Sequence, residues 1–151
     1  MTFTALPQVH LAVIERLRNS AAHMQLVTGV FDEIPSPAPG YPYEAVDDAF
    51  ETPDRTFGQN GHVCSVVISI FTQSPSTTKA GTGKAGFAQG LAIAEHVAAL
   101  LTDLEENPLV VQGHDVVNAE IVSIEATREA DGKTRRVDVE IILTLEDEVV
   151  A

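Results

Sequence analysis

Residues 80–90, which read AGTGKAGFAQG, carry the residue types and spacing of a nucleotide-binding turn. Gly81-x-Gly83-x-x-Gly86 matches the glycine pattern that lets a backbone approach a pyrophosphate. Gly83 and Lys84 also match the centre of a phosphate-binding loop, where the lysine reaches the phosphates. The stretch is therefore either a nucleotide site or a glycine-rich entry to the helix that follows it.

The neighbouring positions argue against nucleotide binding. A phosphate-binding loop needs a glycine five positions before Gly83 and a hydroxyl after the lysine, but the chain has Thr78 and Ala85 there. A dinucleotide turn begins directly after a strand, and the preceding β-like run ends near Thr72. We therefore expect a loop that enters a helix and contacts a partner through its lysines, and keep a nucleotide-binding enzyme using Gly81–Gly86 as an alternative. The two lysines are Lys79 and Lys84.

The other chemistry-bearing residues form no recognisable site. No two histidines have metal-ligand spacing, and a single cysteine excludes a disulfide within the chain. His62 and Cys64 stand two apart in a predicted strand and share a face, but no further ligand is evident. Cys64 lies in an apolar run, which favours a small buried side chain over a reactive thiol. We predict no catalytic residue, no cofactor and no metal.

The composition indicates one domain, residues 1–151, with an acidic surface. The chain is 44% hydrophobic and carries 22 acidic against 9 basic residues, a net charge of −13. Such a surface repels nucleic-acid phosphates, and it suits a protein that lets DNA pass without binding it. Apolar runs are too short for a membrane span, and the first residues do not resemble a signal peptide, so we expect a cytoplasmic setting.

Hydrophobic periodicity predicts an α+β fold in the order α, β, β, β, α, β, β. The fold has a largely antiparallel or mixed sheet, two main helices packed on it and a C-terminal β-hairpin. The strand over 62–72 is apolar on both faces, so we expect it to be central and covered on both sides. Asp131-Gly132 predicts a type I′ hairpin turn. The helices are expected over 7–23 and 85–104, and the strands over 27–31, 43–49, 62–72, 116–127 and 134–146.

The order of these features resembles that of the tail terminator (tail completion) proteins of long-tailed bacteriophages and related gene-transfer particles. The resemblance spans residues 6–146 and includes VTGVFDEIP, YPYEAV, the loop ETPDRTFGQNG, the strand HVCSVVISIFT and the hairpin DGKTRRVDVEIIL. Glu44 departs from it, because the family pattern usually has an aliphatic residue there.

The resemblance implies a structural virion protein at the head-tail junction, assembled in the host cytoplasm. Such proteins form a hexameric ring that caps the tail tube, contacts the tube protein and the head-tail connector or neck proteins, and lets genomic DNA pass through its channel. A neck or head-completion protein, and a small ligand-binding adaptor, are the other interpretations. We expect the interface to involve the basic hairpin tip and the acidic group to face the channel. The tip comprises Arg128, Lys133, Arg135 and Arg136, and the acidic group comprises Asp47, Asp48, Glu51 and Asp54.

Overall fold

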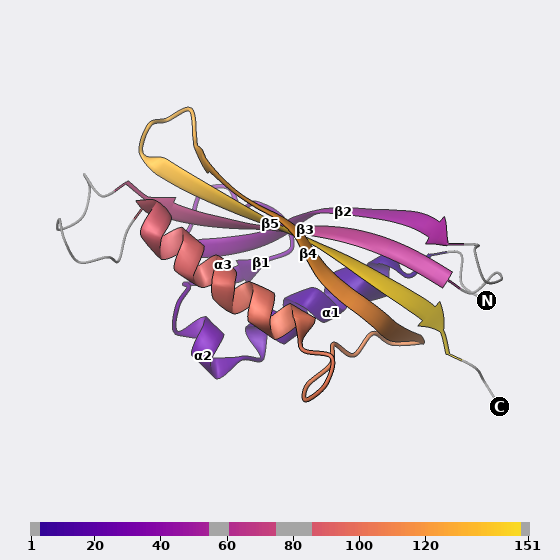
Figure 1. The fold of residues 1–151 in the computed structure, drawn as a ribbon. Helices are drawn as coiled ribbons and strands as arrows, with labels where there is room; N and C mark the ends of the chain where they lie inside the picture. Colours follow the sequence, from indigo (N-terminus) through magenta and orange to yellow (C-terminus); the bar gives the residue numbers. More distant parts are fainter. Residues whose placement is uncertain (1–3, 55–60, 75–85, 149–151) are drawn as a thin grey trace.

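The computed structural model describes residues 4–54, 61–74 and 86–148, and it confirms the α+β class (Figure 1). Its helices and strands in chain order are α1 (Leu6–Arg18), α2 (Ala21–Met24), β1 (Val30–Phe31), β2 (Tyr43–Asp54), β3 (Gly61–Gln73), α3 (Gly86–Thr102), β4 (His114–Arg128) and β5 (Thr134–Asp147).

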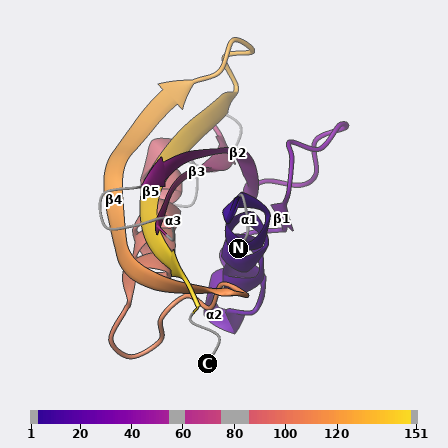
Figure 2. The ribbon, with the colours of Figure 1, turned by 90° about the vertical axis from the view of Figure 1, so that its right-hand side faces the viewer.

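The strands form one mixed sheet in the order β1-β2-β3-β5-β4. The short β1 runs parallel to β2, and the other neighbours are antiparallel. The sheet curves around α1 and α3, which both lie on its concave side (Figure 2). The helices of the described part of the chain are too short or too polar to span a membrane.

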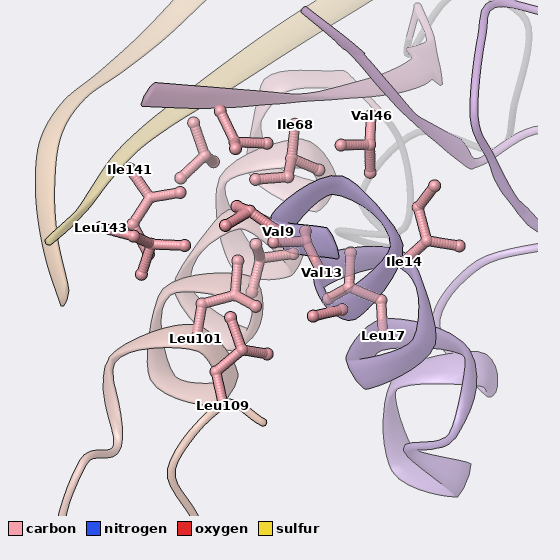
Figure 3. Close-up of a cluster of buried hydrophobic side chains, with 14 of the residues drawn as sticks. Val9, Val13, Ile14, Leu17, Val46, Ile68, Leu101, Leu109, Ile141 and Leu143 are labelled. Atoms are coloured by element: carbon pink, nitrogen blue, oxygen red, sulfur yellow. The ribbon is translucent and has the colours of Figure 1, made fainter. Parts of the chain in front are cut away.

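The core fills the space between the two long helices and the concave face of the sheet. Side chains from α1 and α3 point toward those of β2, β3 and β5 (Figure 3). Leu17, Ile68, Leu101, Ile141 and Leu143 are fully buried there. The alternation predicted for the last strand is confirmed, because its odd positions from 137 to 145 all belong to this core.

The first helix is shorter than predicted. α1 ends at Arg18, and a separate turn of helix, α2, begins after Ser20. Ser20 has an extended backbone, and its hydroxyl accepts a hydrogen bond from the His23 N–H at 3.2 Å. The Ser20 hydroxyl takes the N–H that a continuous helix would use for its own backbone hydrogen bond. The predicted helix over 7–23 is therefore divided in two at Ser20.

The expectation that β3 is covered on both faces was wrong in part. β3 is the central strand, but the helices of the described residues cover only one side of it. On the other side Val63, Ser65 and Val67 stay half-exposed. Only the far end of that face is closed, by a small cluster in which the Tyr43 and Phe71 rings stack at 4.8 Å.

The remaining boundaries differ at β1, β2 and the hairpin turn. β1 has only two residues, whereas β2 continues to Asp54, into a stretch for which we expected a polar loop or the splayed end of a hairpin. The turn is not type I′, because that turn needs a positive φ at both central residues and only Gly132 has one, at 72°. Instead the Gly132 N–H donates to Glu129 O, and the Asp131 carboxylate accepts from the N–H groups of Lys133 and Thr134.

Candidate assembly surface

The convex side of the sheet, which we call the open face, is not covered by a helix of the described chain. The register across β2, β3, β5 and β4 places one set of alternating side chains on it. Most of its charged groups are acidic, and Arg136 is the basic side chain among the described residues there. The acidic residues of the open face are Asp47, Asp48, Asp115, Glu120, Glu125, Asp138, Glu140 and Glu146.

Two shallow depressions lie side by side on the open face. One, of about 370 Å³, is lined by apolar side chains such as Phe50, Val63 and Ile142 together with Asp48 and Glu140. The other, of about 340 Å³, is lined mostly by carboxylates and by Arg136. Phe50 is 64% exposed in the first depression, which makes it a candidate contact residue.

Both outer edges of the sheet have long stretches without a partner strand in the described chain. β1 pairs only with Glu44 and Ala45, and His10 Nε2 donates to the Val46 carbonyl at 2.7 Å, so the free edge of β2 begins at Asp47. β4 forms the other edge over its whole length, Val122 is 43% exposed there, and Val117 and Ile124 are exposed too. Free strand edges of this length are templates for pairing with another chain.

The acidic group predicted from the sequence lies on β2 and is divided between the two faces of the sheet. Asp47 and Asp48 lie on the open face, where Asp47 accepts from the Ser69 hydroxyl at 2.9 Å and lies 3.5 Å from Arg136. Glu51 points the other way, toward α1. The side chain of Asp54 lies outside the described residues. The group is therefore not a single surface cluster.

Glu51 supports the fold and is not an exposed surface charge. Its Oε1 accepts from the Ala5 N–H at 2.6 Å and from the Thr4 hydroxyl at 3.1 Å, at the start of α1. Burial by itself raises the pKa of Glu51, but these hydrogen bonds outweigh it and hold the pKa below its usual value. A carboxylate at a helix N-terminus is stabilising, so Glu51 fixes α1 on the sheet.

The basic hairpin tip is likewise divided. Arg128 and Lys133 are exposed, but Arg135 is only 7% exposed. Its guanidinium donates to Gly132 O at 3.2 Å and to Ser74 Oγ at 3.4 Å, and it lies 5.6 Å from the centre of the Phe87 ring. Arg135 is therefore part of the fold, which corrects the expectation that it forms an exposed tip.

Arg136 lies on the open face and binds the acidic residues around it. Its Nε donates to Asp138 at 2.8 Å and its Nη2 to Ser69 Oγ at 3.0 Å. The guanidinium also lies 5.3 Å from the centre of the Phe71 ring. Half-buried and paired, Arg136 offsets part of the negative charge of the open face.

Most of the glycine-rich loop, with Lys79, Gly81, Gly83 and Lys84, lies outside the described residues. Gly86, at the start of α3, has a φ of 66°, and its carbonyl accepts from the Thr72 hydroxyl at 2.8 Å. Both sheet neighbours of β3 run antiparallel to it. A dinucleotide turn belongs to adjacent parallel strands, so the described topology gives this motif no support.

Two buried polar groups were not predicted. His23, fully buried on α2, contacts the Glu44 carboxylate through Nε2 and lies 2.9 Å from His96 of α3 through Nδ1. Burial raises the pKa of Glu44 and lowers that of His96, which the charge of His23 lowers further. Glu44, which departs from the family pattern, therefore connects β2 to α2 and α3 through His23. The second group, of His62, His114 and Asp147, lies at the end of the sheet where β5 ends.

Cys64 is buried, as predicted. Its thiol donates to Glu51 Oε1 at 3.4 Å. Burial, with the neighbouring Glu51 carboxylate, raises the pKa of Cys64 to about 12, so the thiolate needed for nucleophilic chemistry does not form near neutral pH.

A family model, Tail completion protein gp17, matches residues 11–146. The chain belongs to this family. The match covers most of the chain, including α3, strands β1 to β4, β5 up to its penultimate residue and α1 from Leu11 onward, and it makes the protein a structural component of a phage-type virion tail. The resemblance inferred from the sequence is confirmed.

A solved structure also supports the assignment of this protein to a virion particle. A chain in the virion of a native gene transfer agent (GTA) particle is 26% identical in sequence, with a TM-score of 0.72, and the match covers 96% of this chain and 99% of that one. No curated protein sequence matches. The two chains therefore share a fold over nearly their full lengths.

Proposed function

We propose that the protein is the ring-forming terminator of a tail tube, which caps the last tube ring and joins the tail to the head or neck proteins. The observation that carries this proposal is the match to a tail completion family over residues 11–146. The solved chain with the same fold belongs to the virion of a gene transfer agent particle.

The two free sheet edges support assembly into a closed ring of six copies. A ring needs a heterologous interface, in which two different patches of each subunit meet. The outer edges of β2 and β4 are such a pair, because they lie on opposite sides of the subunit and differ in sequence. Pairing of the β4 edge with the β2 edge of the next copy extends the sheet around the ring.

The acidity of the open face supports its orientation toward the DNA channel. Asp48, Glu140 and their acidic neighbours repel a passing phosphate backbone, so the genome moves without adhering. In this orientation α1 and α3 face outward. Of the predicted channel acids, Asp47 and Asp48 keep that role and Glu51 does not.

Deletion of the gene from its own particle tests the terminator role. Without a terminator, tube polymerisation continues, and we expect tails of irregular and excessive length that do not join heads. Tails of normal length that fail only to join heads would instead assign the protein to the neck. That alternative is favoured by no contact in the described structure.

A pair of valine substitutions tests the ring interface. Val122→Lys adds a charge to the β4 edge, where lysine is known to discourage strand pairing, and leaves the core untouched. Val110→Lys is the matched control, because Val110 is 81% exposed and lies outside the sheet. We expect the first variant to remain a folded monomer in light-scattering measurements at concentrations where the control forms rings. Equal assembly of both variants would exclude β4 as the interface.

A further inference from the structure

β3 and β4 begin and β5 ends at the same end of the sheet (Figure 1). Two histidines and an aspartate from these strand ends lie close together there. His62 Nε2 and His114 Nδ1 each lie 2.9 Å from the same atom, Asp147 Oδ1. Each residue offers one potential ligand atom, and these atoms all lie within 4.8 Å of one another. The two rings meet edge to face with centroids 5.1 Å apart.

Strand register, not sequence proximity, brings the three residues together. His114 pairs directly with Asp147 in the β4–β5 ladder, and His62 pairs with Leu145, two positions before Asp147 on the same face. The His114 N–H also donates to Val111 O at 3.1 Å. Ligands on paired strands are held more exactly in place than ligands on loops, which favours a preformed site.

Hydrogen bonding among the described residues leaves this group incomplete. His62 and His114 are each only 4% exposed. Asp147 Oδ1 is the hydrogen-bond partner of His62 Nε2, and His114 Nδ1 lies at ion-pair distance from the same oxygen without forming a hydrogen bond to it. Asp147 Oδ2 is buried without a hydrogen-bond partner among the described residues. Buried polar atoms are normally paired, since an unpaired one costs about 1–3 kcal/mol. A cation between the two imidazole nitrogens and Asp147 Oδ1 gives His114 Nδ1 the partner that it lacks.

We propose that His62, His114 and Asp147 bind a divalent transition-metal ion, for which zinc is the best chemical match. Two imidazoles and one carboxylate are a common zinc donor set, whereas magnesium and calcium prefer oxygen ligands alone. The fourth position is left to water or to a group from another chain. Zinc bound here joins the starts of β3 and β4 to the end of β5.

Glu51 is placed as the outer partner of such a site. Its Oε2 lies 3.6 Å from His62 Nδ1, the ring nitrogen that faces away from Asp147. A carboxylate on the free nitrogen of a ligating histidine fixes the orientation of the ring, and its loss weakens metal binding about 10- to 100-fold.

Cobalt and zinc titrations of the full-length protein test this proposal. The chain is purified without a histidine tag, stripped of metal with a chelator and titrated with Co²⁺. We expect one equivalent to give the visible absorption of four-coordinate cobalt, and zinc to displace it with a dissociation constant below about 1 μM. Zinc should also raise the melting temperature, while magnesium and calcium at the same concentration should not.

Single substitutions locate the site. We expect His114→Gln to abolish the cobalt spectrum, Glu51→Gln to weaken zinc binding about 10- to 100-fold, and His10→Gln, a histidine outside the group, to leave both unchanged. Absence of the cobalt spectrum in the wild-type protein, zinc binding weaker than about 1 μM, or an unchanged spectrum in His114→Gln would each overturn the proposal. The wild-type titration tests the proposal without any variant, so a misfolded variant would not leave the proposal untested.

Discussion

Replacement of Arg135 should destabilise the fold, although the residue stands in a basic hairpin tip. Its guanidinium is buried against Phe87 and donates to Gly132 O and Ser74 Oγ, so it joins the hairpin to the end of β3 and the start of α3. Arg128, in the same hairpin, is exposed. A comparison of substitutions at the two arginines therefore distinguishes a structural role, expected for Arg135, from a role in surface contacts, open to Arg128.

The structure sets the size of the effect. Arg135→Met keeps the aliphatic stem but removes the hydrogen bonds, which contribute about 0.5–1.5 kcal/mol each, and the contact with Phe87, which contributes about 0.5–2 kcal/mol. We expect a loss of about 2–3 kcal/mol, equivalent to a fall in melting temperature of roughly 4–12 °C for a chain of this size. Arg135→Glu should cost more, because it buries an unpaired carboxylate.

Urea denaturation followed by circular dichroism measures these changes. Arg128→Met and Arg128→Glu are the matched controls, and each should stay within about 0.5 kcal/mol of the wild-type protein, as exposed substitutions usually do. A loss for Arg135→Met no larger than that for Arg128→Met would refute the assignment of Arg135 to the fold.

Three further predictions concern the helices, the buried acid and the glycine-rich loop. Gly90→Ala places a Cβ 2.8 Å from Val137 Cγ2, so we expect a loss of up to about 2 kcal/mol in urea unfolding, smaller in a Val137→Ala background; equal losses in both backgrounds would exclude the clash. Burial raises the pKa of Glu44, so the folded state holds its proton more tightly than the unfolded state does. The stability of the wild-type protein relative to Glu44→Gln should therefore fall as the pH rises above 4.5, and a constant or rising difference in thermal melts would contradict this. Calorimetry with ATP, GTP and NAD(H) should show no saturable binding tighter than about 100 μM, and such binding abolished by Lys84→Ala would restore the nucleotide interpretation.

The elements with regular hydrophobic patterns were predictable from the sequence. Alternation over 137–145 identified the buried face of β5, and helical spacing identified α3 to within two residues at each end. The extension of β2 beyond Ala49 could not be decided between a loop and the splayed end of a hairpin, because its second half is polar and contains Pro53. An edge strand tolerates proline and polar residues, since the backbone N–H groups on its outer side do not hydrogen-bond to another strand.

The candidate residues were harder to place, because we treated residues that are close in sequence as one cluster and did not assign each of them to a face of its strand. Arg135 and Arg136 are adjacent in a strand and therefore point to opposite sides. The parity of Val137 already placed Arg135 on the buried face, a signal that was available in the sequence. The group of His62, His114 and Asp147 had no such signal, because it depends on the register of β3 and β4 against β5.

Cryo-electron microscopy of purified particles tests the central claim most directly, because it shows the position, copy number and orientation of the subunit at once. We predict a six-fold ring at the head-proximal end of the tail tube, with Asp48 and Glu140 of the open face toward the channel and α1 and α3 outward. A subunit located elsewhere in the particle, or a ring whose channel is lined by α1 and α3, would contradict the account.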